Sequence, residues 1–121
     1  MKVIIDELLE AFPTAIFVLH RPIWYSPNTH NSSQYLVSGL KRMESYYPRL
    51  QELVKHYAEK CPGQVFMGDT EASAYFETHY QTELVPEEGR AGTFYLHPNK
   101  KGAEVLATFW GKAIYNTVMF R

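Results

Sequence analysis

His97 is the residue of this chain whose type and setting best suit catalysis. It follows the apolar residues Phe94, Tyr95 and Leu96, and Pro98 restricts the backbone directly after it. An imidazole has a pKa near ~6.5 in water, which makes it the natural general base at neutral pH. Such a base needs a nucleophile on one side and an orienting group on the other. The alternative for any single histidine is a surface or helix-capping role, so the neighbouring residues must decide.

The segment 96–114 resembles the last sequence block of the SGNH, or GDSL-type, hydrolases. In it, His97, Pro98 and Asn99 are followed after two residues by Gly102, and then by an apolar pattern of helical spacing. The resemblance extends over most of the chain, because the order of its earlier strands and helices is similar to the C-terminal half of that family. Only the final block is specific.

This resemblance implies ester hydrolysis by a serine nucleophile, with His97 as the base and without a metal or an organic cofactor. It implies an α/β, partial flavodoxin-like three-layer fold with two or so parallel strands and flanking helices. The implied substrate is a small-molecule carboxylic ester, such as a sugar acetate or a lipid. The Gly-Asp-Ser block and the oxyanion-hole blocks of the family are absent from the chain. The serine would then come from a segment upstream in the intact gene or from another chain.

The orienting acid of His97 is not where the family has it. That position, three residues before the histidine, is Phe94, which cannot accept a hydrogen bond from the imidazole. The sequence leaves four options open: Asp69 as the acid partner, Glu71, a backbone carbonyl, or a serine–histidine pair with no acid. Ser26 is the best serine within the chain, although no serine lies on a strand-to-helix turn flanked by small residues.

Two other groups of reactive side chains are weaker candidates. Glu71, Glu77 and His79, taken together with His97, match no metal-ligand spacing, so we predict no metal site. The single cysteine, Cys61, has the surroundings of a buried or idle thiol rather than those of a nucleophile.

Composition narrows the class of protein. The chain has 121 residues, which is enough for one small domain and not two. The resemblance implies that 1–121 is a single, partial SGNH-like domain. Its 12 basic and 13 acidic residues give a net charge of −1, which predicts neither a nucleic-acid partner nor a membrane partner. The longest apolar run, 15–19, is too short to span a bilayer, and acids such as Asp6 do not fit the core of a signal peptide. Because Cys61 cannot form an internal disulfide, we predict a cytoplasmic protein.

The elements that must position His97 begin with a helix and a strand. Apolar residues spaced for one face predict a helix over 2–12, and the continuous β-branched and aromatic run 14–20 predicts a strand buried on both faces. A loop over 21–33 follows, and its aromatic residues Trp24 and Tyr25 are predicted to cover the substrate pocket.

Helical periodicity then resumes over 33–60, where Pro48 predicts either two helices or one kinked helix. Beyond it, the expected elements are a strand over 64–69, a mostly irregular segment over 70–92 with a short helix at 72–80 as an option, and a helix over 99–115.

Strands that alternate with helices predict crossover connections and a parallel sheet. Two strands are fewer than such sheets usually have, so one flank would remain an open apolar edge. This pattern predicts completion of the sheet by homo-oligomerisation. It also gives the alternative function, a catalytically inactive remnant that self-associates as a structural or interaction protein.

Overall fold

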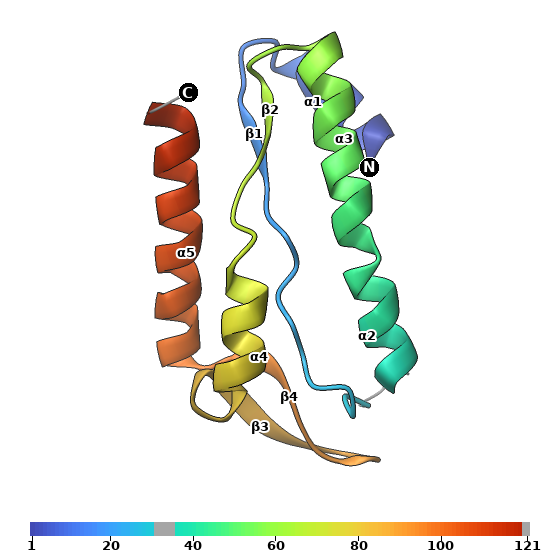
Figure 1. Ribbon diagram of the computed structural model, residues 1–121, viewed down its shortest axis with the longest axis vertical. Coiled ribbons are helices and arrows are strands. Elements are labelled where there is room, and N and C mark those ends of the chain that lie inside the picture. The colour runs from blue at the N-terminus through green and yellow to red at the C-terminus, as the bar shows by residue number, and fades with distance from the viewer. Residues whose placement is uncertain (31–35, 120–121) are drawn as a thin grey trace.

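The computed structural model describes residues 1–30 and 36–119 (Figure 1). The part of the predicted loop and helix that falls on residues 31–35 lies outside this description. The elements, in chain order, are α1 (Lys2–Ala11), β1 (Phe17–Leu19), α2 (Leu36–Glu44), α3 (Tyr46–Lys60), β2 (Val65–Met67), α4 (Ala72–Glu83), β3 (Leu84–Gly89), β4 (Gly92–Pro98) and α5 (Lys100–Met119).

The two predicted apolar strands form a parallel pair. Phe17 of β1 lies opposite Val65 of β2, and Leu19 lies opposite Met67. Figure 1 shows this pair between α5 on one side and α3 on the other, which makes a small layered arrangement of helices around parallel strands. The mixed helix–strand content and the parallel pairing expected from the sequence are therefore confirmed.

One core lies between the parallel pair and the N-terminal helices. Ile5 of α1, Tyr57 of α3 and Val65 of β2 are buried together, and Phe17 and Leu19 pack against them. The Tyr57 hydroxyl extends from this core to the carboxylate of Asp6 at 2.5 Å and to the carbonyl of Lys2 at 3.1 Å. These two bonds fix α1 to α3 and close this face of the sheet.

The segment 70–92, predicted to be mostly irregular, is instead α4 followed by a hairpin. The optional helix exists and runs three residues further than predicted, to Glu83. From there β3 and β4 pair in antiparallel fashion through a turn at Gly92, whose φ of 93° suits glycine. The prediction failed because Pro86 and the adjacent glutamates are poor strand formers, and the pairing with β4 overrides that preference.

The break in the helical region 33–60 lies at Ser45 and not at Pro48. Helix α2 ends at Glu44, and α3 begins at Tyr46. Pro48 therefore falls in the first turn of α3, where backbone N–H groups have no partner within the helix and a missing N–H costs little.

In the part of the chain that the structure describes, no helix combines the length and the hydropathy needed to cross a bilayer.

Candidate functional site

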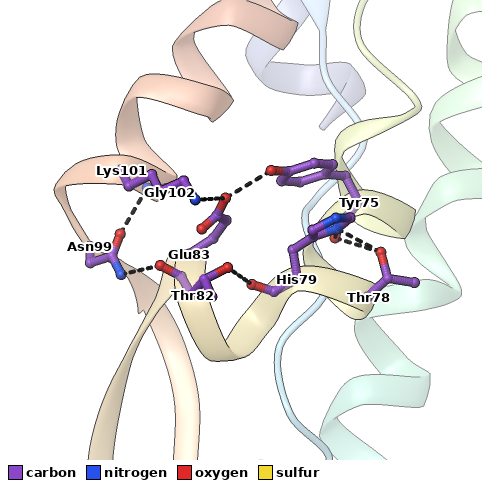
Figure 2. A network of polar contacts seen from close by, with 8 residues as sticks. All are labelled: Tyr75, Thr78, His79, Thr82, Glu83, Asn99, Lys101 and Gly102. Atoms are coloured by element: carbon purple, nitrogen blue, oxygen red, sulfur yellow. Dashed lines mark hydrogen bonds and ion pairs between the residues drawn. The ribbon is translucent and has the colours of Figure 1, made fainter.

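The corner after His97 is built on Asn99, which caps α5. Its side-chain oxygen accepts the N–H of Gly102 at 2.8 Å, in the first turn of the helix. Its side-chain nitrogen donates to the carbonyl of Thr82 at 2.8 Å, and its backbone N–H donates to the carbonyl of Glu83 at 3.0 Å (Figure 2). Asn99 therefore joins the beginning of α5 to the end of α4 and fixes the backbone directly after the histidine.

Gly102 makes the close approach of α4 and α5 possible. A Cβ atom at this position would lie 2.0 Å from the carbonyl oxygen of Glu83, a distance that no side chain tolerates. The spacing of asparagine and glycine in the sequence is thus explained by helix capping and close packing. Neither residue is placed to take part in chemistry.

Glu83 supplies a buried acid beneath this corner. Its side chain is 1% exposed and accepts a hydrogen bond from the Tyr75 hydroxyl at 2.8 Å, and Lys101 lies 3.4 Å away (Figure 2). Burial alone would raise the pKa of the Glu83 carboxyl, but hydrogen bonds from Tyr75 and Thr82 and the charge of Lys101 hold that pKa below its ordinary value. The ionised carboxylate therefore ties α4 to the first turn of α5.

His97 lies on β4, and its partner is Glu87 on β3. The distance from Nδ1 of His97 to Oε2 of Glu87 is 2.9 Å. The histidine side chain is 64% exposed and the glutamate side chain 33% exposed. An ionised carboxylate only accepts hydrogen bonds, so Nδ1 must carry the proton and donate it. In the neutral ring this leaves the lone pair on Nε2, on the side of the ring away from Glu87.

An irregularity in the hairpin brings these two side chains to the same face. In an unbroken ladder, His97 would lie on the opposite face from Phe94 and from Glu87, which pairs with Phe94. The register shifts by one residue where 95–98 of β4 oppose 84–86 of β3. The extra residue reverses the alternation of side chains, as a β-bulge does, and turns His97 to the face of Glu87.

Asp69, the predicted acid partner, has a different position and different contacts. Its carboxylate accepts the N–H of Ala72 at 3.0 Å and the N–H of Glu71 at 3.3 Å, so it caps the beginning of α4. His97 follows the far end of this 12-residue helix, which is about 18 Å long. The structure therefore does not bring Asp69 and His97 together.

A second histidine lies at the end of β1. The Asp69 backbone N–H donates to Nδ1 of His20 at 2.9 Å, and the ring of His20 stacks on Trp110 with 4.7 Å between centroids. Burial lowers the pKa of His20, and the nearby Asp69 charge opposes part of this shift. His20 is therefore held as a neutral hydrogen-bond acceptor.

The two aromatic residues predicted to cover a pocket have different roles. Trp24 is 7% exposed and packs in a core cluster with Phe76, and its ring centroid lies 5.3 Å from that of Tyr80. Tyr25 is half-buried and lines a hollow of about 260 Å³ together with Met43 and Tyr46 of the neighbouring helices. The burial of Trp24 follows from the packing of the loop against α4.

Ser26 has a structural role. Its hydroxyl is buried, accepts the N–H of Tyr95 at 2.8 Å and lies 3.3 Å from the hydroxyl of Thr29. These bonds join the loop after β1 to β4. Two other serines, Ser32 and Ser33, lie outside the described residues.

Sequence reasoning missed Glu87 because it missed the hairpin. The signal was present: Glu87-Glu88-Gly89 and Gly92 flank a short turn, and a hairpin centred there places Glu87 opposite Phe94, the position at which the family resemblance expects an acid.

Across residues 1–30 and 36–119, no three histidine, cysteine, aspartate or glutamate side chains lie close enough together to hold a metal ion. Comparison with family models, with curated proteins and with solved structures gives no match for this chain. The assignment of a function consequently depends on the geometry of the site.

Proposed function

We propose that this chain is the histidine-bearing half of a serine-type acyl-ester hydrolase. In this proposal Glu87 accepts the Nδ1 proton of His97 and orients the ring. Nε2 of His97 then removes the proton from a serine hydroxyl and later returns it to the leaving alcohol. The serine and the oxyanion-hole donors come from a segment upstream in the intact gene or from another chain.

The observation that carries the proposal is the 2.9 Å contact between His97 and Glu87. It supplies the pairing of base and orienting acid that acyl transfer needs, and it leaves the basic nitrogen on the accessible side of the ring. Glu87 takes the place of the acid that the SGNH resemblance expects at Phe94. Because β3 holds Glu87 directly opposite that position, a carboxylate reaches the imidazole by a different route.

The architecture supports a partial flavodoxin-like, SGNH-type fold. Helix α5 runs antiparallel to β1 and β2, so its N-terminus and the hairpin lie beyond the carboxyl ends of the strands (Figure 1). Ligands of open parallel sheets bind at that end. The substrate class we propose is a small carboxylic ester, either a sugar acetate or a lipid-like ester, and no organic cofactor is needed.

Hydrolysis of p-nitrophenyl acetate by the natural protein that contains this chain tests the proposal. We expect His97→Ala to lower kcat/KM at least ~10³-fold, as removal of a triad member does, and Glu87→Ala to lower it by a smaller factor. The matched control His30→Ala should stay within twofold. Activity that survives His97→Ala would contradict the assignment of the base.

A fluorophosphonate probe, which labels activated serines, locates the nucleophile. We expect no labelled serine on the isolated chain, because Ser26 is buried and hydrogen-bonded. A label on any serine of this chain would contradict the placement of the nucleophile elsewhere.

The second candidate is a catalytically silent, self-associating interaction protein of the cytoplasm. It is favoured by apolar side chains that α1 leaves exposed, among them Met1 at 63%, Val3 at 69% and Ile4 at 57%. Under this alternative the chain forms a homo-oligomer, and both variants at the His97–Glu87 pair leave its behaviour unchanged. Sedimentation equilibrium of the wild-type chain and of His97→Ala separates the two candidates when it is combined with the ester assay.

A further inference from the structure

We propose that the outer edge of β1 is a binding site for an extended strand that is apolar on both of its faces. This inference concerns the sheet and not the reaction, so it holds whether or not the chain hydrolyses esters.

The edge is defined by the hydrogen bonds of β1. The N–H of Phe17, the carbonyl of Leu19 and the N–H of Arg21 all bond to β2 or to the residues that flank it. Backbone groups alternate in direction along a strand, so those of Val18 and His20 point to the other edge. Within the described residues β1 has β2 as its sole strand neighbour, which leaves these groups as a template for another strand.

A hollow of about 610 Å³ runs along this edge and is lined by both faces of β1. Leu19 belongs to the face that packs on α1 and α3, whereas His20 belongs to the face that stacks on Trp110 of α5. Val18, Leu19 and His20 all line the hollow. Because the hollow contacts side chains from both faces of β1, it lies around the outer edge of this strand. An extended segment in the hollow would therefore lie in the plane of the sheet, next to β1.

The two helix layers have apolar side chains where an added strand would lie. On one side Tyr46, Leu50 and Leu53 of α3 line the hollow at helical spacing. On the other side of the sheet, Trp110 and Ile114 lie one turn apart on α5. Their side chains are 38% and 41% exposed, so they remain available for contact with an added strand. Arg49 also lines the hollow, but the other α3 residues that do so have apolar or aromatic side chains, so each face of an occupant would mainly contact apolar groups, as a buried parallel strand does.

The shape of the hollow favours a free extended segment over a second copy of this chain. The edge of β1 forms the floor, and α3 together with Met1 forms a wall along it. In a two-fold dimer the occupant would be the edge of another β1, which lies behind the same wall. A second copy would bring its own α3 and Met1 toward the space that the hollow occupies, whereas a single strand without helices brings none.

A synthetic decapeptide tests the site: six alternating valines and isoleucines with two lysines at each end, acetylated and amidated. We expect it to slow hydrogen exchange at the Val18 and His20 amides of the full chain at least tenfold. A peptide of the same length with two central prolines should have no effect, because proline cannot form the ladder. Equal protection by both peptides, or protection by neither, would overturn the proposal.

Two variants and one control locate the binding. Leu50→Lys places a charge in the wall, and Val18→Pro removes the donor on the outer edge without removing a bond to β2; each should weaken peptide binding at least tenfold. Val37→Lys adds the same charge at a half-exposed residue of α2 outside the hollow and should change the affinity less than twofold. Should the peptide-free chain sediment as a dimer with the Val18 and His20 amides already protected, the occupant is a second copy and the proposal is wrong.

Discussion

Gly102 of α5 faces the carbonyl oxygen of Glu83 at the end of α4, and a Cβ atom at residue 102 would lie 2.0 Å from that oxygen. The two helices meet at this contact, and Asn99 and Lys101 tie them together around it. The orientation of the strand that carries His97 depends on the same junction, because β4 leads directly into it.

Gly102→Ala should consequently lower the free energy of unfolding by about 3 kcal/mol, since the backbone of α4 must shift to admit a methyl group. Gly111→Ala is the matched control in the same helix, where an added Cβ meets no atom within 4 Å. It should stabilise the chain by ~0.5–1 kcal/mol through helix propensity. Urea unfolding of the two variants measures both values, and equal effects would contradict the close contact.

Asn99→Ala should cost ~1–2 kcal/mol, because the variant loses the cap of α5 together with the bond to Thr82. Asn99→Asp keeps an acceptor for the N–H of Gly102 and loses only the donor to Thr82. We expect its unfolding midpoint to lie between those of the wild type and of Asn99→Ala. An aspartate variant no more stable than the alanine variant would show that capping is not the main contribution.

The contact between His97 and Glu87 predicts the tautomer of the ring. Nδ1 carries the proton while Glu87 accepts it, so nitrogen NMR of the neutral ring should show mainly the Nδ1–H form. Glu87→Ala should move the ring toward the mixture found in free histidine, in which Nε2–H predominates. Glu88→Ala is the matched control, since Glu88 bonds instead to Thr93. A ring that is mainly Nε2–H in the wild type would contradict the pairing.

The lowered pKa of His20 predicts that the folded chain becomes less stable in mild acid. Its pKa in the folded chain is lowered, mainly by burial, so between the folded value and ~6.5 the unfolded chain binds a proton that the folded chain does not. The stabilisation is therefore complete above ~pH 6.5 and decreases as the pH falls below it. His20→Asn keeps an acceptor near the N–H of Asp69 and does not titrate. Its unfolding free energy should depend less on pH between 5 and 7 than that of the wild type.

The raised pKa of Tyr57 predicts that the folded chain becomes less stable as the pH rises into the alkaline range. Burial, and then the hydrogen bond and charge of Asp6, raise its pKa to about 12. The folded chain therefore retains a proton that the unfolded chain loses above ~pH 10, and stability decreases as the pH rises from there to about 12. Tyr57→Phe should remove this part of the alkaline decrease and cost ~1–3 kcal/mol at neutral pH, because the hydrogen bond to Asp6 is lost and only Lys60 remains near that carboxylate. Thermal melts across this range check both effects.

The sequence predicted the elements whose apolar pattern is strong. The strands Phe17–Leu19 and Val65–Met67 consist only of apolar residues, and their parallel pairing followed from the crossover helices between them. The helix after His97 was predicted to begin at Asn99, and Asn99 is its cap. In each of these segments, local preference and tertiary packing favour the same structure.

The hairpin and the acid of the site were not predictable in this way. Pro86 and the glutamates of β3 are unfavourable in strands, and pairing with β4 is a tertiary interaction that no local pattern reports. The sequence likewise gave no sign that Asp69 would be used as a helix cap, since a carboxylate before a helix fits either role. The burial of Trp24 depends on how the loop after β1 folds onto α4, which is equally non-local.

Because the bulged hairpin alone supplies both His97 and Glu87, the acid–base couple is a self-contained module. Its two members lie ten positions apart in the sequence, and both belong to the hairpin strands. A further strand that joined the sheet would therefore not be needed to bring His97 and Glu87 together. A split of the polypeptide between the two halves of such a domain would leave this module preformed, ready for whichever hydroxyl is brought within its reach.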